Sequence, residues 1–363
     1  MKGQIGFREV AAILLFSIGL KSSNGAAALV LREAANSSWM IPFLSGILMV
    51  VPFLATISVL KKHENLSLVE ISYKLLGRFG GFIVGLALFL NVLTIMVAFG
   101  RSYSELVHTA NLPKTPLIVS FIVFASIGYY LANRGIEVIG RTAWLLIWPL
   151  KFFVVLLAIL AIFLLKPEIE YVFPITGPGV SVILSEAFDH IGLFSEVIFI
   201  AVFYPFIQNH HQYIRGTMLG FVLGAIEISV FFFLYITVFG AESVRYITFP
   251  FQELTSILTF GTFLPNIDAF YFLIWSGAAF IRFAVYLYLL VAIYGQTFHI
   301  KEFEPLILPF AALVVLLGMF PSSGVIVQKY LMEGTLSKIF VLTLIILPLI
   351  LWLTDHLKGK MQT

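Results

Sequence analysis

The chain has 363 residues, of which 60% are hydrophobic and only 11% are charged. Because soluble domains carry about 25% charged residues, this composition excludes a soluble globular protein and predicts an all-α, polytopic membrane protein. The small net charge of +3 gives no sign of nucleic-acid binding, and the lack of cysteine excludes disulfides and thiolate metal sites. The first apolar run leads to Lys21 and not to a cleavage site of small residues, so we expect it to remain as a membrane helix.

Ten segments meet the requirement of about 20 apolar residues for a membrane helix. They cover residues 8–35, 39–60, 80–107, 116–132, 141–165, 182–206, 216–240, 266–295, 304–321 and 336–356. The longest connections, residues 61–79 and 241–265, are too small to be domains. We therefore expect residues 1–363 to form a single transmembrane domain.

Lysine and arginine residues in the connections indicate the orientation, because cytoplasmic loops carry an excess of them. With the N-terminus inside, twelve of these residues lie on the inner side and six on the outer side. An even number of helices then predicts that both termini are cytoplasmic. Residues 66–77 have apolar side chains at helical spacing, which predicts a short amphipathic helix on the inner face, with a solvated loop as the alternative.

A polar interruption lies in the middle of the first segment, where residues 21–25 read Lys-Ser-Ser-Asn-Gly. The bilayer core offers no water, so broken backbone is tolerated only where it lines a protein cavity. A break also exposes amide N–H groups at a positive helix end, which suits a carboxylate. The residues predicted to bind a ligand there are Ser22, Ser23, Asn24, Gly25 and Ala26. The structural alternative is a helix kink packed by small residues.

The sixth segment repeats this pattern. Residues 18–22 read Ile-Gly-Leu-Lys-Ser and residues 191–195 read Ile-Gly-Leu-Phe-Ser, an offset of 173 residues. The same shift places the first five segments on the last five, and five is an odd number, so the two halves cross the membrane in opposite directions. This predicts a five-plus-five inverted repeat, residues 8–165 and 181–356, with the first and sixth helices broken at matching positions.

Three polar residues, His190, Ser195 and Glu196, surround the second interruption. An ionisable group inside a membrane is costly and is a functional candidate by default. Glu196 has three possible roles: it receives a ligand amine, pairs with Lys21, or carries a proton. The structural alternative is a carboxyl group satisfied by a neighbouring helix.

Lys151 lies ten residues into the fifth segment from Arg141, which corresponds to a depth of about 15 Å. At that depth it can replace a sodium ion as a fixed cation or carry a proton, with a structural ion pair as the alternative. Glu227 and Arg282 are similarly deep, and we expect them to pair with other spans, with no partner assigned.

The aromatic residues are too numerous to mark a site, and no motif selects among the pocket-wall candidates Phe99, Tyr103, Phe194 and Trp275. His210 and His211 are adjacent and do not share a helix face, so we expect no metal site there. No nucleophile, metal or cofactor constellation is present in the sequence. We therefore expect no enzyme activity and no cofactor.

Ten helices, broken helices 1 and 6 and the five-plus-five repeat resemble the amino acid/polyamine/organocation transporter superfamily with the LeuT fold. Three stretches narrow the resemblance to the B subunit of spore germinant receptors. They are residues 67–77, beginning Ser-Leu-Val-Glu and ending Leu-Gly, residues 133–137, Asn-Arg-Gly-Ile-Glu, and residues 173–175, Phe-Pro-Ile.

The resemblance implies a subunit that senses a small germinant together with an A subunit and a lipoprotein C subunit in the spore inner membrane. It carries ligand binding over to residues 22–26 and to Phe194, Ser195 and Glu196. It also matches Lys151 to a lysine at a former sodium site in some sodium-independent transporters. Transporter relatives often have a glycine-rich first break, whereas this chain reads Ser-Ser-Asn-Gly, so ligand preference does not carry over.

Three functions therefore stay open. The first is a germinant sensor in which an amino acid such as L-alanine binds one of two states better and so shifts their populations. The second is a proton-coupled, sodium-independent amino-acid transporter with Lys151 or Glu196 as the proton carrier. The third is a scaffold or channel subunit that does not transport amino acids.

Overall fold

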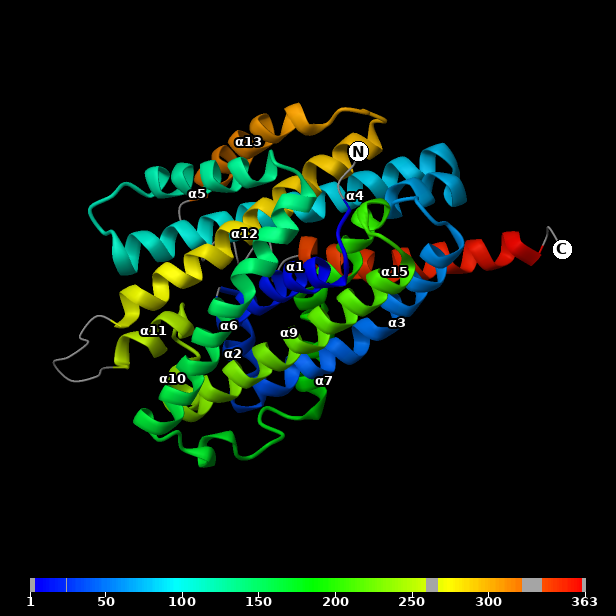
Figure 1. Ribbon diagram of the computed structural model, residues 1–363. Coiled ribbons are helices and arrows are strands. Elements are labelled where there is room, and N and C mark those ends of the chain that lie inside the picture. Colours follow the sequence, from blue (N-terminus) through cyan, green and yellow to red (C-terminus); the bar gives the residue numbers. More distant parts are fainter. Residues whose placement is uncertain (1–3, 24, 259–266, 322–334, 361–363) are drawn as a thin grey trace.

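The computed structural model describes residues 4–23, 25–258, 267–321 and 335–360. These residues form helices joined by turns, with one isolated bridge between Ile5 and Ile207 (Figure 1). The first half contains α1 (Phe7–Gly19), η1 (Leu20–Ser22), α2 (Gly25–Ala34), η2 (Ala35–Met40), α3 (Ile41–Lys62), α4 (Leu68–Leu106), η3 (Val107–Asn111), α5 (Leu117–Ala132) and α6 (Ile136–Leu165).

The second half begins after the connection that contains η4 (Ile169–Val172). It contains α7 (Val180–Asp189), η5 (Ile191–Phe194), α8 (Glu196–Phe199), η6 (Ile200–Phe206), α9 (His210–Phe239), α10 (Ala241–Val244), α11 (Pro250–Ile257), α12 (Ile267–Thr297), η7 (Glu304–Leu306), α13 (Ile307–Met319) and α15 (Thr335–Lys360). Each apolar segment expected from the sequence therefore corresponds to a helix or to a group of consecutive helices.

The number of membrane spans is supported only in part. Within the described residues, six helices are long and apolar enough to cross a membrane, and α7 with residues 191–206 makes a seventh if this bent pair is one span. The pair bends by 45°, at the interruption predicted in the sixth segment. The helices Leu117–Ala132 and Glu304–Met319 are apolar but shorter. The described chain is thus an all-helical membrane protein with six to seven such spans.

The predicted amphipathic helix forms the first turns of α4. Ser67 accepts a hydrogen bond from the backbone N–H of Glu70, and the Glu70 carboxylate accepts one from the backbone N–H of Ser67. This capping box fixes the start of the helix. Gly77 then adopts a φ of 77°, a left-handed conformation that glycine tolerates, and the chain turns there into the long apolar part of α4.

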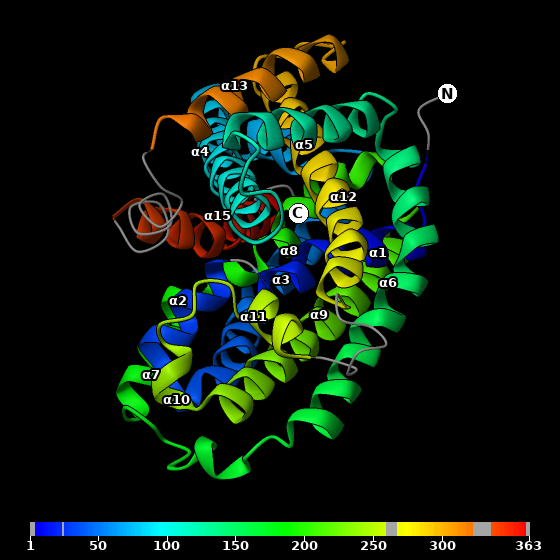
Figure 2. The same cartoon turned by 90° about the vertical axis from the view of Figure 1, so that its left-hand side faces the viewer.

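The first helix occupies the centre of the molecule. Figure 2 shows α1 surrounded by α6, α9 and α12. Three glycines of α9 let it approach α1 closely: a Cβ atom at Gly216, Gly220 or Gly224 would lie within 2.7 Å of a side-chain atom of Val10, Leu14 or Ile18 respectively. Such four-residue spacing of small residues is typical of close helix contacts in membranes. It holds the broken part of the first segment against α9.

Different elements lie at the two ends of the helical bundle. Near the N-terminus, the backbone of Ile5 is hydrogen-bonded to Phe206 and Gln208, at the end of η6. At the same end the Asp355 carboxylate of α15 contacts Lys62 and His63 at the end of α3. Figure 1 shows α10 and α11 at the opposite end of the bundle.

Candidate functional site: a charged cavity at two helix breaks

The helix that begins at Phe7 is interrupted where the sequence predicted. α1 ends at Gly19, a single turn of 3-10 helix covers Leu20–Ser22, and α2 begins at Gly25. Asn24 lies outside the described residues. The hydroxyl groups of Ser22 and Ser23 donate hydrogen bonds to the carbonyl oxygens of Gly19 and Leu20, at 2.7 and 2.8 Å. These serine side chains therefore satisfy the backbone at the end of α1.

Lys21 joins this break to the break in the sixth segment. Its ammonium group is buried and donates to the carbonyl oxygens of Gly192 and Leu193, at 3.2 and 2.6 Å, and to Glu196 Oε2, at 2.6 Å. An ammonium group has three N–H donors, so all three have acceptors here. Helix ends leave carbonyl groups short of backbone donors. The Gly192 carbonyl also accepts from the backbone N–H of Ser195, and Lys21 adds a charged donor to it and to the Leu193 carbonyl.

Both oxygens of the Glu196 carboxylate, at the start of α8, accept hydrogen bonds. Its Oε2 accepts from Lys21, and its Oε1 accepts a short hydrogen bond from the Tyr286 hydroxyl group. Nη2 of Arg282 lies 3.7 Å from the same Oε1. Of the roles considered from the sequence, the geometry corresponds to pairing with Lys21, because neither carboxylate oxygen is left unoccupied.

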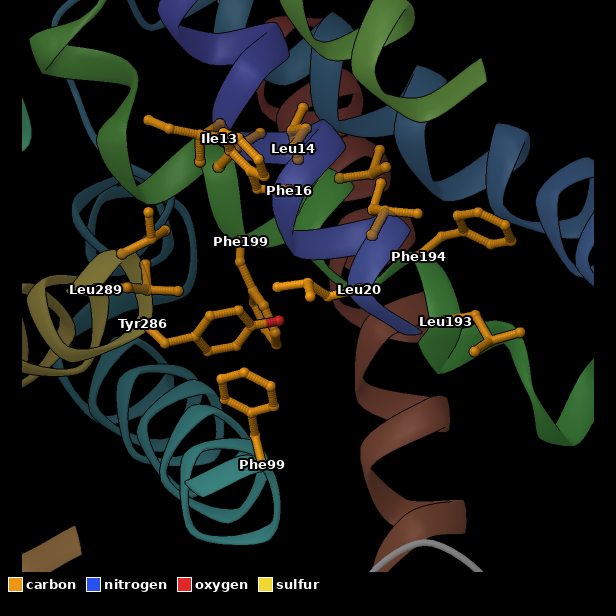
Figure 3. Packing of buried hydrophobic residues seen from close by; sticks show 14 of the residues in the cluster. Ile13, Leu14, Phe16, Leu20, Phe99, Leu193, Phe194, Phe199, Tyr286 and Leu289 are labelled. Atoms are coloured by element: carbon orange, nitrogen blue, oxygen red, sulfur yellow. The ribbon is translucent and has the colours of Figure 1, made fainter. Parts of the chain in front are cut away.

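Arg282 and Tyr286 both belong to α12, and their spacing of four residues places them on one helix face. Arg282 is only 2% exposed, and its guanidinium carbon lies 4.4 Å from the centre of the Phe99 ring. Its Nε and Nη1 have no hydrogen-bond acceptor within the described residues. Figure 3 shows the rings of Phe99 and Tyr286 next to each other beside Leu20.

A cavity of about 110 Å³ lies between these elements. Its walls come from the two broken segments and from α4, α12 and α15. The lining residues are Lys21, Ala26, Leu29, Asn91, Thr94, Ile95, Ala98, Asp189, His190, Gly192, Leu193, Ser195, Arg282, Phe340, Val341 and Leu344. Asp189 is exposed and forms part of the rim, whereas the Arg282 and Asn91 side chains are buried inside. The cavity therefore joins an exposed anion to an interior that carries cations.

The predicted site residues are only partly brought together. Ala26 and Ser195 line the cavity, and Gly25 is buried at the start of α2. Phe194 is buried elsewhere, with its ring centre 5.0 Å from that of Phe221, and Figure 3 shows it on the other side of Leu20 from Tyr286.

The other aromatic residues considered as pocket walls lie together. Phe99, Tyr103 and Trp275 line a second, smaller cavity of about 20 Å³, together with Leu20 and Ser23 of the first break. The Tyr103 hydroxyl group donates to Ser276 Oγ at 2.6 Å. This second cavity lies next to Arg282 because both share contact with Phe99.

Lys151 forms a separate ion pair. Its ammonium group on α6 donates to both carboxylate oxygens of Glu227 on α9, to Oε1 at 2.7 Å and to Oε2 at 2.5 Å. A Cβ atom at Gly19 would lie 2.8 Å from the Glu227 carboxylate, so the pair sits against the end of α1. Neither residue lines the two cavities described above. The structural ion pair considered for Lys151 is therefore present.

Sequence reasoning gave no role to two residues of the site, Asn91 and Tyr286, and no partner to Arg282. The spacing of Arg282 and Tyr286 on one predicted helix was a usable signal, because an arginine and a hydroxyl group one turn apart can serve the same acceptor. Asn91 is an isolated amide in an apolar span, where a polar side chain is costly unless it has a partner or a ligand.

Comparison with known proteins places this arrangement in a family. Residues 9–325 match the sequence profile of the family described as spore germination protein. The chain belongs to the spore germination protein family. This germination protein is 24% identical to spore germination protein B2 of Bacillus subtilis (strain 168) over 349 residues, which cover 93% of this chain and 92% of the relative. It is 25% identical over 348 residues to spore germination protein A2 of the same organism, covering 93% and 91%.

Solved structures of transporters share the fold of the germination protein. MhsT in complex with L-phenylalanine superposes with a TM-score of 0.64 at 14% identity, covering 98% of this chain and 99% of that chain. Mhp1, a nucleobase-cation-symport-1 family transporter, gives 0.62 at 14% identity, covering 94% and 78%. At such identities the similarity shows the fold alone. The germination protein is a B subunit with the LeuT-like fold of these transporters, and it is not an enzyme.

Proposed function

We propose that this B subunit binds a small germinant, an amino acid such as L-alanine, in the cavity between the two helix breaks. The observation that carries the proposal is that both breaks line one cavity with charged groups from separate helices inside it. Ligand pockets are concave, mostly apolar and equipped with a few convergent polar groups. MhsT, whose fold is similar, is described in complex with L-phenylalanine, which supports an amino acid as the ligand.

The bound state is read by partner subunits, which we propose to be the A and C subunits of the receptor in the spore inner membrane. Lys21 ties the two breaks directly to each other, so a ligand in the adjoining cavity can favour one arrangement of the broken helices. A signal requires that the ligand binds one of two arrangements better, because equal affinity shifts nothing.

The proposed topology has ten spans, arranged as inverted repeats over residues 8–165 and 181–356, with both termini cytoplasmic. The two shorter apolar helices and the interrupted first helix supply the spans beyond the six or seven of ordinary length. The end of the bundle where α3 and α15 meet carries Lys62, Lys74 and Lys358. Basic residues favour the cytoplasmic side.

Direct binding of L-amino acids to the purified chain in nanodiscs, with and without its partner subunits, tests the proposed site. Ala26→Leu places three more carbon atoms in the cavity and should abolish binding at normal protein levels, as should Gly25→Leu at the start of α2. Ala28→Leu is the matched control, because Ala28 lies on the same helix and does not line the cavity. Unchanged affinity in Ala26→Leu would place the ligand elsewhere.

A second candidate function is proton-coupled, sodium-independent amino-acid transport. The similarity to transporter folds favours it, as does the presence of two intramembrane carboxylates that are paired with lysines, Glu196 and Glu227. Purified protein in liposomes distinguishes the two functions. Accumulation of an amino acid driven by a proton gradient supports transport, whereas binding without uptake supports a sensor.

A further inference from the structure

The charged cluster beside the cavity contains one more cation than anions. Lys21 and Arg282 are two buried cations, Glu196 is the buried anion between them, and all three are at most 5% exposed. A buried charge without a partner is costly. The cavity walls also include Asp189, which is exposed and lies at the rim, and His190, which is partly exposed. The interior of the cavity is thus suited to a negative group.

The unused hydrogen-bond donors show which cation is available. Lys21 has acceptors for all three of its N–H groups, so it cannot take a ligand without giving up a contact. Arg282 leaves Nε and Nη1 without an acceptor in the part of the chain that the structure describes. Nδ2 of Asn91, which is 1% exposed, also has none there. Arg282 and Asn91 both line the cavity, from α12 and α4 respectively.

We infer that Arg282 and Asn91 receive the carboxylate of the ligand inside this cavity. The inference rests on the proposed function and adds which chemical group is recognised and by which side chains. Guanidinium nitrogens lie in a planar fork that matches the two oxygens of a carboxylate, and an amide N–H adds a third donor. The site lies on helices 3 and 8 of the proposed topology, and not at the amide groups of the first break.

The inference also orients the ligand. Asp189, at the rim of the same cavity, offers an anion to the ammonium group of an amino acid. A free amino acid then lies with its carboxylate inward and its ammonium group toward the rim. The side chain meets the apolar walls formed by Leu29, Ile95 and Leu344.

The test compares each amino acid that binds with its own carboxamide, for example L-alanine with L-alaninamide. All twenty L-amino acids are first titrated against the full chain in nanodiscs. The carboxamide keeps the shape but removes the negative charge, so we expect its affinity to be about 10- to 100-fold weaker, as for the loss of hydrogen bonds to a charged group. If no amino acid binds, the proposed function and the inference both fail. If one binds and its carboxamide binds equally well, the inference fails and the proposed function stands.

Two variants test whether Arg282 and Asn91 cause the preference for the amino acid over its carboxamide. Arg282→Gln should bring the affinities of the amino acid and its carboxamide within about threefold of each other, because the charge-assisted part of the contact is lost. Asn91→Asp should weaken binding of the amino acid more than binding of the carboxamide, because it places a carboxylate beside the carboxylate of the ligand. Arg101→Gln is the matched control: Arg101 is a buried arginine on α4 outside the cavity, paired with Glu105.

Three results would overturn the assignment. One is a folded Arg282→Gln protein that prefers the amino acid over its carboxamide as strongly as the unmodified protein does. Another is loss of this preference in Arg101→Gln. The third concerns chloride, which could occupy the same donors as a small anion. Titrations in gluconate and in chloride buffer separate the two: if binding requires chloride and is equally strong for the acid and the amide, chloride is the anion held by these donors and the assignment fails.

Discussion

The ammonium group of Lys21 lies 2.6 Å from Glu196 Oε2, and this contact connects the interruptions of the first and sixth segments. Both side chains are buried. The same ammonium group satisfies two carbonyl oxygens of the chain just before Glu196. One side chain therefore compensates a carboxylate and donates to a broken helix end, and it links the two breaks directly.

Lys21→Met should strongly destabilise the protein. Removing one partner of a buried ion pair leaves an uncompensated charge and typically costs about 3–5 kcal/mol. Adding Glu196→Gln should recover part of this loss, because the remaining partner is then neutral. Unfolding in detergent measures both. Arg32→Met is the control, since its pair with Glu33 is exposed and the expected cost is about 0–1 kcal/mol. Similar losses in Lys21→Met and Arg32→Met would contradict the role of Lys21.

Tyr286→Phe should cost more than Tyr103→Phe. Tyr286 donates to the Glu196 carboxylate, and hydrogen bonds to charged groups contribute about 1.5–3 kcal/mol. Tyr103 donates to the neutral Ser276 hydroxyl group, for which about 0.5–1.5 kcal/mol is expected. The free energy of unfolding is measured for both variants. Equal losses would show that the hydrogen bond to Glu196 stabilises the protein no more than the one to Ser276.

Gly220→Ala should destabilise the packing of α9 against α1. Its Cβ atom would lie 2.6 Å from Leu14 Cβ and 3.0 Å from the Ala11 carbonyl oxygen, so the helices must move apart at a cost of about 1–3 kcal/mol. Gly277→Ala on α12 is the control, because its Cβ atom would meet nothing within 4 Å. Alanine is preferred over glycine in a helix by about 0.5–1 kcal/mol, so this variant should be slightly more stable. A stabilised Gly220→Ala protein would argue against the close approach.

Lys151→Met tests the second ion pair. It leaves the Glu227 carboxylate uncompensated against Gly19, and since the Lys151 side chain is 22% exposed we expect a loss near the lower end of the range, about 3 kcal/mol. Lys151→Met with Glu227→Gln should recover stability. In that double variant the ligand response is then measured across pH. If the ligand response of the double variant depends on pH in the same way as that of the unmodified protein, the Lys151–Glu227 pair does not take part in proton coupling.

Several sequence expectations were tested by the structure. The apolar segments correspond to helices, although α4, α6 and α9 begin five to twelve residues before the expected starts. The two polar interruptions correspond to breaks, since a bilayer requires long apolar helices and tolerates irregular backbone only where protein protects it. The pairing of Lys21 with Glu196 was one of three options for that carboxylate. The partner of Arg282 was not predicted. Of the predicted ligand-binding residues, Ala26 and Ser195 line the cavity, whereas Phe194 packs against Phe221 away from it.

The sequence by itself determined the membrane class, the helical segments, the family resemblance and the two breaks, because each of these depends on local hydropathy and on short motifs. Only the tertiary structure decided which charges meet. Lys21 and Glu196 are 175 residues apart, and Lys151 and Glu227 are 76 apart. Contact at such separations depends on the rotation and depth of each helix in the bundle, which the packing of glycines such as Gly220 against α1 sets and which no local pattern contains.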